Sequence, residues 1–216
     1  MKTFHLTVSK TATFYQIGEF SAETDTVWFV CHGYGQRADF FLRNFQILDT
    51  GKNVIIAPEA LSKFYREGTS GHVGASWMTK YQRETEIEDY INYLNQLFEG
   101  VQLNFPAEIK INILGFSQGG ATVCRWLAAS LIPCNRLILW GAAFPEDMNF
   151  DFSLETLKQT NIVLVTGSED DIIPKEMPAG QFELLRSYGI TPQIVSFNGG
   201  HHLNEEILNQ IDLGII

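Results

Sequence analysis

The chain has 216 residues, of which 25 are Asp or Glu and 15 are Lys or Arg, so its net charge is −10. Nucleic acid and anionic membrane surfaces attract clustered Lys and Arg, and the basic residues here are scattered, so neither partner is expected. The length and the ordinary apolar content exclude a disordered or coiled-coil chain and favour one globular domain over residues 1–216.

The amino terminus and the cysteines indicate a cytoplasmic protein. The segment MKTFHLTVSK lacks the apolar stretch of a signal peptide, and no apolar run reaches the roughly 20 residues that a membrane helix needs. Stable membrane association is therefore not expected. Cys31, Cys124 and Cys134 are odd in number and lack C-x-x-C spacing, so we expect reduced, buried thiols.

Short apolar runs alternate along the chain with longer amphipathic ones. At the amino terminus, Thr3–Val8 and Thr13–Phe20 predict an antiparallel hairpin at one edge of a sheet. Six runs rich in Val and Ile predict strands: Val27–Cys31, Val54–Ala57, Ile109–Leu114, Arg136–Trp140, Ile162–Thr166 and Gln193–Phe197. Four segments predict helices: Glu84–Phe98, Ala121–Leu131, Ala179–Tyr188 and Leu203–Ile211. The alternation predicts an α/β fold with a mostly parallel sheet and helices on both faces.

The candidate nucleophile follows the strand Ile109–Leu114. Ligands bind such sheets at the carboxyl ends of the strands, where this chain has Gly115-Phe116-Ser117-Gln118-Gly119. This is a G-x-S-x-G pattern between a strand and a helix, which exposes the Ser117 hydroxyl on a sharp turn. The amino end of the next helix favours a developing anion. The alternative is a tight glycine turn with an incidental serine.

A serine hydroxyl needs an adjacent base, and the base needs an orienting acid. Two later strands are followed by residues of these types: Glu169, Asp170 and Asp171, and then His201 and His202. The chain order of serine, acid and histidine is that of α/β-hydrolases. A histidine pair also suits a metal, but no HExxH or other compact ligand spacing completes a site, so we expect neither metal nor cofactor.

The loop after Val27–Cys31 is His32-Gly33-Tyr34-Gly35-Gln36, whose glycines let the backbone turn and present N–H groups. In this fold the oxyanion hole takes one N–H from this loop and one from the residue after the nucleophile, which predicts Tyr34 and Gln118. A phosphate cradle is the competing interpretation, but a third glycine and a P-loop lysine are missing. We expect His32 to pack beneath the loop.

HGYGQ, INILGFSQGG, GSEDDIIP and GGHH together resemble the phospholipase/carboxylesterase branch of the α/β-hydrolases, which includes acyl-protein thioesterase-like enzymes. The resemblance covers nearly the whole chain and implies an α/β-hydrolase fold. It points to Asp170 rather than Asp171, and to His201 rather than His202. Ala75-Ser76-Trp77 looks like the Ala-Trp pair that the family carries before its long helix.

Two departures from the family concern the substrate. Tyr34-Gly35-Gln36 stands where the thioesterase members usually have Leu-Gly-Asp, and no insertion is long enough for a large lid. Both departures favour a small ester over a lipid or protein substrate.

The segment Ser62–Met78 lies at the site end of the sheet, between a strand and the long helix. Its aromatic residues are candidates for an acyl or alcohol pocket, although an irregular loop that packs its own aromatics is an equal alternative. The candidates are Phe64, Tyr65 and Trp77 on this segment, and Phe144, Phe150 and Phe152 after another strand.

The sequence thus predicts a serine hydrolase that cleaves small carboxylic esters or thioesters through an acyl-enzyme on Ser117. A hydrolase-fold binding protein with little turnover is the alternative. A nucleotide-binding α/β protein is a third candidate, disfavoured by the missing phosphate motifs. Nothing in the pattern specifies an oligomeric state.

Overall fold

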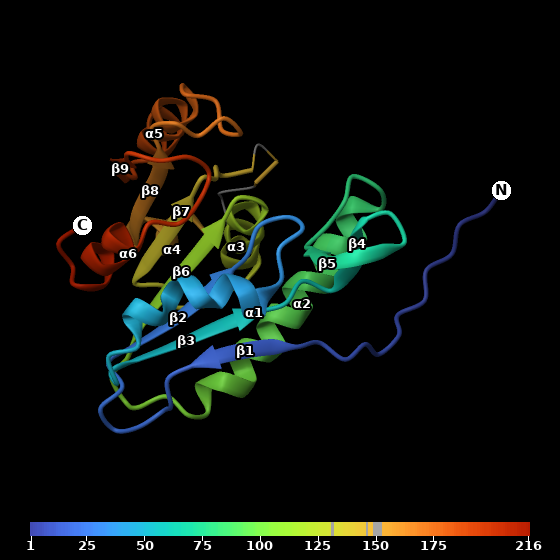
Figure 1. Ribbon diagram of the computed structural model, residues 1–216, viewed down its shortest axis with the longest axis horizontal. Helices are drawn as coiled ribbons and strands as arrows, with labels where there is room; N and C mark the ends of the chain where they lie inside the picture. Colours follow the sequence, from blue (N-terminus) through green and yellow to red (C-terminus); the bar gives the residue numbers. More distant parts are fainter. Residues whose placement is uncertain (131, 146, 149–152) are drawn as a thin grey trace.

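The computed structural model describes residues 1–130, 132–145, 147–148 and 153–216, and a seven-stranded sheet runs through it in the order β1-β3-β2-β6-β7-β8-β9 (Figure 1). The strands are β1 (Phe14–Ile17), β2 (Thr26–Cys31), β3 (Asn53–Pro58), β6 (Lys110–Phe116), β7 (Arg136–Trp140), β8 (Asn161–Gly167) and β9 (Gln193–Phe197). All neighbouring pairs are parallel except β1 with β3. The predicted mostly parallel sheet is confirmed.

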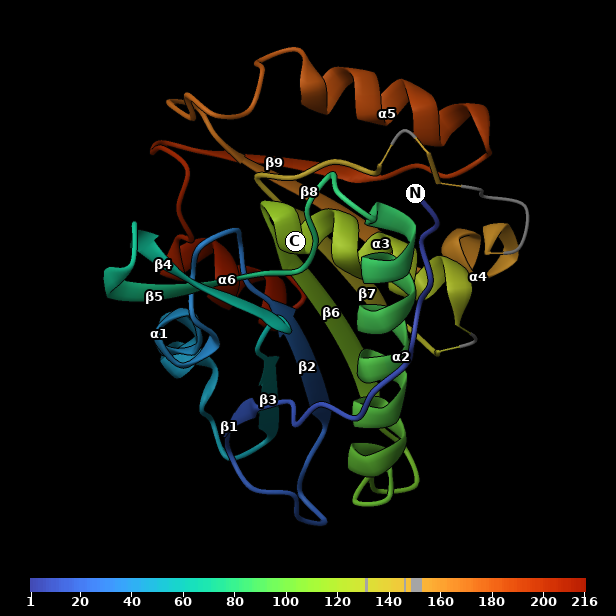
Figure 2. The same ribbon diagram turned by 90° about the vertical axis from the view of Figure 1, so that its right-hand side faces the viewer.

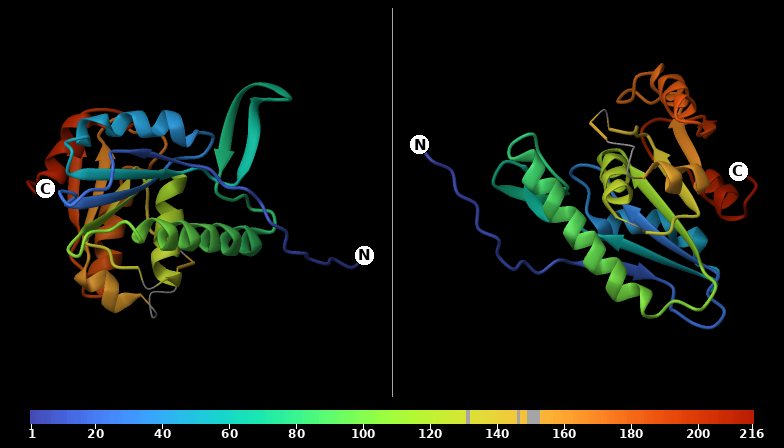
Figure 3. Two further views of the ribbon diagram at one scale, coloured as in Figure 1. Left: turned by 90° about the horizontal axis from the view of Figure 1, so that it is seen from below. Right: turned by 180° about the vertical axis from the view of Figure 1, so that it is seen from behind.

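Helices cover both faces of the sheet, because consecutive residues of its central strands are apolar and point to opposite faces. In β2, Val27 and Phe29 face one core, whereas Trp28 and Val30 face the other. The first core is covered by α2 (Arg83–Gln102), α3 (Gln118–Ala129), α4 (Leu154–Gln159) and α5 (Met177–Ser187). The second is covered by α1 (Ala38–Phe41), the 3-10 helix η1 (Leu42–Leu48) and α6 (Glu205–Asp212), and Figure 3 shows the sheet between the two layers.

Helix α6 is tied back to the first strands of the parallel sheet. The Asp212 carboxylate accepts hydrogen bonds from Trp28 Nε1 at 3.3 Å and from Asn53 Nδ2 at 3.0 Å. The end of the chain therefore packs against β2 and β3. None of the described helices is long and apolar enough to cross a membrane.

The predicted amino-terminal hairpin is wrong. Of the two segments predicted to pair, only the second contains a strand, β1. It pairs antiparallel with β3, with Phe14 opposite Pro58. The chain before β1 is fixed to the end of β3, where Thr13 O accepts from the Glu59 N–H at 2.9 Å. Thr3–Val8, which precedes this contact in the chain, is an extended, exposed arm that does not pair with β1 (Figures 1 and 3).

The segment Ser62–Met78 is not an irregular loop. It forms a separate antiparallel hairpin of β4 (Ser62–Glu67) and β5 (Ser70–Ser76), with Phe64 opposite Gly74. Figure 2 shows this hairpin projecting from the body of the sheet. Its base is joined to the loop after β2 by a bridge between Gln36 and Ala75, which places the hairpin beside the carboxyl ends of the strands.

Candidate active site

Ser117 stands on a tight elbow between β6 and α3. Its φ is +52°, a strained value for a residue with a side chain. The elbow fits only because its neighbours are glycines: a Cβ on Gly119 would lie 2.2 Å from the Cys31 carbonyl oxygen, and one on Gly120 would lie 2.2 Å from the Ala142 Cβ. The close packing of α3 on the sheet therefore raises the half-buried Ser117 above the strand ends.

Asp170 and His201 are paired. Asp170 Oδ2 lies 2.7 Å from His201 Nδ1, and the side chains are 2% and 11% exposed. The other oxygen, Oδ1, accepts from the main-chain N–H groups of Ile172 at 2.9 Å and Ile173 at 3.0 Å. Among the described residues, the hydrogen bonds to this carboxylate come from the loop after β8 and from the histidine, so the acid is held in one orientation.

The hydrogen bonds around Asp170 favour its charged form. Burial alone would raise its pKa, but the hydrogen bonds from His201 and from the Ile173 and Ile172 N–H groups outweigh this effect, and the pKa lies below its ordinary value. The carboxylate is thus ionised at neutral pH and can stabilise a protonated imidazole.

His201 lies beside the elbow. The Ser117 N–H donates to the Trp140 carbonyl at 3.0 Å, and the next residue, Gly141, lies under the imidazole. The ring of Phe116, which precedes the serine, has its centroid 4.8 Å from that of His201. Within the described residues, His201 Nε2 is buried and has no hydrogen-bond partner, so no bond to the serine hydroxyl is formed in this structure. Such bonds often tighten only when substrate binds.

The neighbouring acids and the second histidine have different surroundings. Glu169 and Asp171 are exposed, and neither carboxylate contacts His201. His202 is also exposed, and its Nδ1 lies 2.8 Å from the Leu203 carbonyl. Of the predicted residues in these two loops, the structure therefore pairs Asp170 with His201.

The loop after β2 lies close to the nucleophile. The distance is so short that a Cβ added to Gly33 would be 3.2 Å from the Ser117 Cβ. The N–H groups of Gly33 and Gly35, on either side of Tyr34, donate hydrogen bonds within the fold. In the described part of the chain, the N–H groups of Tyr34 and Gln118 have no partner. Gln118 is also the first residue of α3, where the helix dipole favours negative charge. Two main-chain donors thus remain available beside the serine.

His32 packs beneath this loop, as expected. The Ala60 N–H donates to its Nε2 at 3.1 Å, so Nδ1 carries the proton and donates to the Gly33 carbonyl at 2.8 Å. Burial lowers the pKa of His32, and the hydrogen bond to Gly33 and the charge of Glu59, which act in the opposite direction, do not offset it. The imidazole is therefore a neutral support for the loop.

The four candidate pocket residues that the structure describes lie in different surroundings. The Phe64 ring stacks on Tyr34 at a centroid distance of 5.2 Å, whereas Tyr65, on the alternate face of β4, is exposed. Trp77 is only 2% exposed, and its Nε1 donates to the His32 carbonyl at 2.8 Å. Phe144 is also buried, in the core that α2 and α3 cover. Of these four, Phe64 is the residue whose ring stacks on Tyr34, and Phe150 and Phe152 lie outside the described residues.

Sequence reasoning missed Gly141, Phe116 and the side chain of Gln118. Gly141 directly follows a predicted strand, which is a signal that could have drawn attention to it. The contacts of the other two join residues far apart in the chain, and no spacing rule encodes them.

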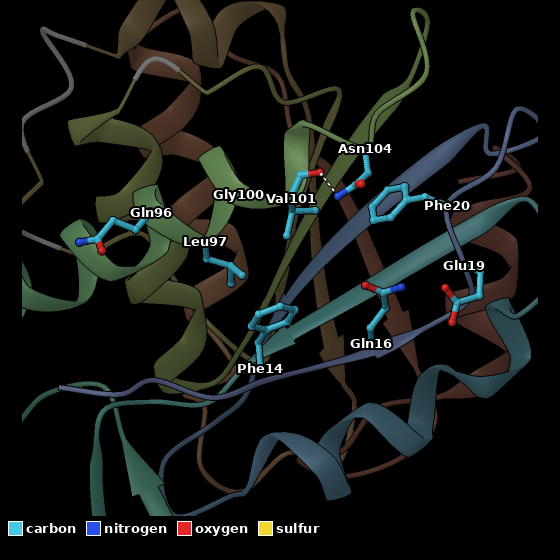
Figure 4. Close-up of a pocket in the computed structure, with 9 residues that line it drawn as sticks. All are labelled: Phe14, Gln16, Glu19, Phe20, Gln96, Leu97, Gly100, Val101 and Asn104. Carbon is cyan, nitrogen blue, oxygen red and sulfur yellow. Dashed lines mark hydrogen bonds between the residues drawn. The ribbon is translucent and has the colours of Figure 1, made fainter.

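A separate groove of about 590 Å³ opens between β1 and the second half of α2 (Figure 4). Phe14, Phe20, Leu97 and Val101 contribute apolar surface to it, and none of the candidate site residues lines it. In the described part of the chain, no three His, Cys, Asp or Glu side chains are grouped as metal ligands.

Solved structures with the same fold include esterases and thioesterases. Acyl-protein thioesterase 2 of Zea mays has a TM-score of 0.69 and 16% identity, covering 95% of this chain and 98% of that one. A carboxylesterase from Mesorhizobium loti has a TM-score of 0.72 and 14% identity, covering 94% and 95%. SOBER1 of Arabidopsis thaliana has a TM-score of 0.67 and 19% identity, covering 89% and 98%. Comparison with curated proteins returned no match.

The sheet order, the serine elbow and the strand-end loops define an α/β-hydrolase fold. Residues 17–213 match the phospholipase/carboxylesterase family, and the chain belongs to this family. It is a carboxylesterase-type hydrolase.

Proposed function

We propose that the protein is a serine hydrolase that cleaves small carboxylic esters or thioesters through an acyl-enzyme on Ser117. The observation that carries the proposal is the 2.7 Å contact between Asp170 and His201, formed next to a serine held at positive φ. A nucleophile, a base and an orienting acid from three different strand ends would then act as one unit.

In the first step, Ser117 Oγ attacks the carbonyl carbon while His201 Nε2 accepts the hydroxyl proton. Asp170 holds the Nδ1–H tautomer and stabilises the imidazolium that forms. The carbonyl oxygen becomes an oxyanion, and the N–H groups of Tyr34 and Gln118 are available to bind it. The unpartnered, buried Nε2 of His201 supports its assignment as the base.

In the second half of the reaction, the tetrahedral intermediate collapses and the C–O or C–S bond to the leaving group breaks. His201 gives its proton to the departing alkoxide or thiolate, which leaves an ester on Ser117. Water then attacks this ester, with His201 as the base, and the carboxylic acid and the free serine are released.

A small substrate is part of the proposal because the Tyr34 and Phe64 rings, stacked at a centroid distance of 5.2 Å, would take up space next to the Tyr34 N–H that is assigned to the oxyanion. Thioesters remain within the proposal because acyl-protein thioesterase 2 of Zea mays shares the fold. We assign the enzyme to the cytoplasm as part of the same proposal, supported by three buried, free thiols, Cys31, Cys124 and Cys134.

The test compares wild type with Ser117→Ala on p-nitrophenyl esters from acetate to dodecanoate, with Ser187→Ala as the matched control. Ser187 is an exposed serine at the end of α5. Turnover by wild type and by the control, together with its loss in Ser117→Ala, is the expected result. Equal activity in all three proteins would remove Ser117 from the mechanism.

A second measurement uses a fluorescent organophosphonate, which reacts only with an activated serine. Labelling of wild type but not of Ser117→Ala is expected. Labelling without turnover of any ester would favour the hydrolase-fold binding protein over the enzyme proposed here. An unlabelled wild type would mean that the nucleophile is not activated at all.

A further inference from the structure

The Gln118 side chain joins the serine elbow to the segment that follows β5. Its Oε1 accepts from the Trp77 N–H at 3.1 Å, and its Nε2 donates to the Met78 carbonyl at 2.8 Å and to Ser76 Oγ at 3.2 Å. The side chain is partly buried and uses both ends of its amide. Gln118, whose main-chain N–H is assigned to the oxyanion, thus also holds the segment after β5 in place through its side chain.

The same segment is also hydrogen-bonded to the loop after β2. The Gly35 N–H donates to the Ala75 carbonyl at 2.8 Å, and the Ala75 N–H donates to the Gln36 carbonyl at 3.0 Å. Trp77 Nε1 adds a third bond, to the His32 carbonyl at 2.8 Å. Ala75–Met78 is therefore bonded both to the loop that carries the Tyr34 N–H and to the elbow that carries the Gln118 N–H.

We propose that the Gln118 side chain is a positioning residue that, through Ala75–Met78, fixes the separation of the two oxyanion donors. The inference rests on the proposed function. The loop after β2 and the elbow end two neighbouring strands, β2 and β6, whose ladder stops at Cys31 and Gly115. Beyond that point, Ala75–Met78 connects them.

The contacts require an amide. Oε1 faces a donor, the Trp77 N–H, while Nε2 faces an acceptor, the Met78 carbonyl. A glutamate in this position has no donor for the carbonyl, and a methionine has neither a strong donor nor a strong acceptor. Both substitutions keep the main-chain N–H of residue 118, so they test the side chain separately from the oxyanion donor.

The experiment measures kcat and KM of Gln118→Glu and Gln118→Met on p-nitrophenyl acetate, and the affinity of a trifluoromethyl ketone, which forms a tetrahedral adduct with the serine. Loss of a whole oxyanion donor lowers kcat by roughly 100–1000-fold, so its misplacement is expected to lower kcat by about 10–100-fold. KM should change by less than about threefold, and affinity for the ketone should fall by the same factor as kcat. Gln102→Glu and Gln102→Met, at an exposed glutamine at the end of α2, are the matched controls.

Trp77→Phe tests the bond between Ala75–Met78 and the loop after β2, because it removes the hydrogen bond to the His32 carbonyl but keeps an aromatic ring. If both side chains act through one segment, the double variant with Gln118→Met loses less activity than the product of the single losses. Unchanged kcat and ketone affinity in the folded Gln118 variants, with wild type active, would overturn the inference and leave the proposed function standing. An inactive, unlabelled wild type would instead be a failure of the proposed function.

Discussion

The imidazole of His201 rests directly on the main chain of Gly141. A Cβ at this glycine would lie 2.8 Å from Cε1 and 2.9 Å from Nδ1 of the ring, and 3.5 Å from Asp170 Oδ2. Gly141 also has a φ of +52°, which favours glycine. The position of the base therefore depends on the absence of a side chain at the end of β7.

Gly141→Ala is expected to lower kcat/KM by about 100-fold, because the methyl group displaces the imidazole from the elbow by a fraction of an ångström to an ångström. The rate of p-nitrophenyl ester hydrolysis gives the measurement. Gly51→Ala is the matched control, since Gly51 has a φ of +78° but no atom within 4 Å of an added Cβ. Both variants carry backbone strain, and only Gly141→Ala touches the base. Equal activities in the two variants would contradict the assignment.

Asp170→Asn is expected to lower kcat by about 10,000-fold, the size of the effect when the orienting acid of such a triad becomes an amide. The amide oxygen keeps the Ile172 and Ile173 N–H groups as partners, and the NH₂ group then faces His201 Nδ1 and favours the wrong tautomer. Steady-state rates of this variant are compared with those of Asp171→Asn. Asp171 is exposed and its variant should retain nearly full activity; the reverse order would transfer the role to Asp171.

The lowered pKa of His32 predicts a loss of stability in mild acid. The unfolded histidine takes up a proton as the pH falls below about 6.5, while the folded one stays neutral, so the free energy of unfolding declines by up to about 1.4 kcal/mol per pH unit. Above that pH the contribution is fully present. Urea unfolding at several pH values between about 8 and 5.5 measures the decline.

His32→Gln separates this residue from the other titrating groups. Its amide oxygen can still accept the Ala60 N–H, but the side chain does not titrate. The stability advantage of wild type over this variant is expected to shrink as the pH falls. A difference that stays constant from neutral to acid pH would show that His32 does not cause the decline.

Two glycines should respond oppositely to alanine. In Gly119→Ala the new methyl group meets the Cys31 carbonyl oxygen at 2.2 Å, so α3 must move away from β2 and the protein should lose about 3 kcal/mol of stability. In Gly180→Ala, within α5, the methyl group meets nothing within 4 Å, and the variant should gain about 0.5–1 kcal/mol. Urea midpoints compare both with wild type, and destabilisation by Gly180→Ala would refute the second expectation.

The strands were predictable where a short apolar run is bounded on both sides by turn-forming residues. Arg136–Trp140 and Gln193–Phe197 have the predicted bounds in the structure, because each is a short apolar run flanked by turn residues, although β7 is buried and β9 is mostly exposed. Thr3–Val8 has the same alternation but no neighbouring strand, and alternation alone does not provide one. The β4–β5 hairpin was missed because β4 is mostly exposed and the buried end of β5 consists of the small residues Gly74, Ala75 and Ser76, so neither strand has an apolar run to mark it.

The site was predictable to the level of its loops. Strand ends indicated the serine, the acidic loop and the histidine pair, whereas the choice of Asp170 and His201 within their loops came from the family resemblance. The hydrogen bonds of Gln118 with Trp77 and Met78 span about 40 residues of sequence. Such contacts arise from tertiary packing and leave no local pattern.

The ties from Asp212 to Trp28 and Asn53 have a kinetic meaning. Trp28 and Asp212 are 184 residues apart, and the chain between them contains every strand end that carries a site residue. Closing so long a loop is entropically slow and must wait for most of the parallel pairing. During refolding, ester hydrolysis should therefore return only after helical circular dichroism has recovered, so that the return of activity reports the docking of α6 on β2 and β3 rather than the collapse of the chain.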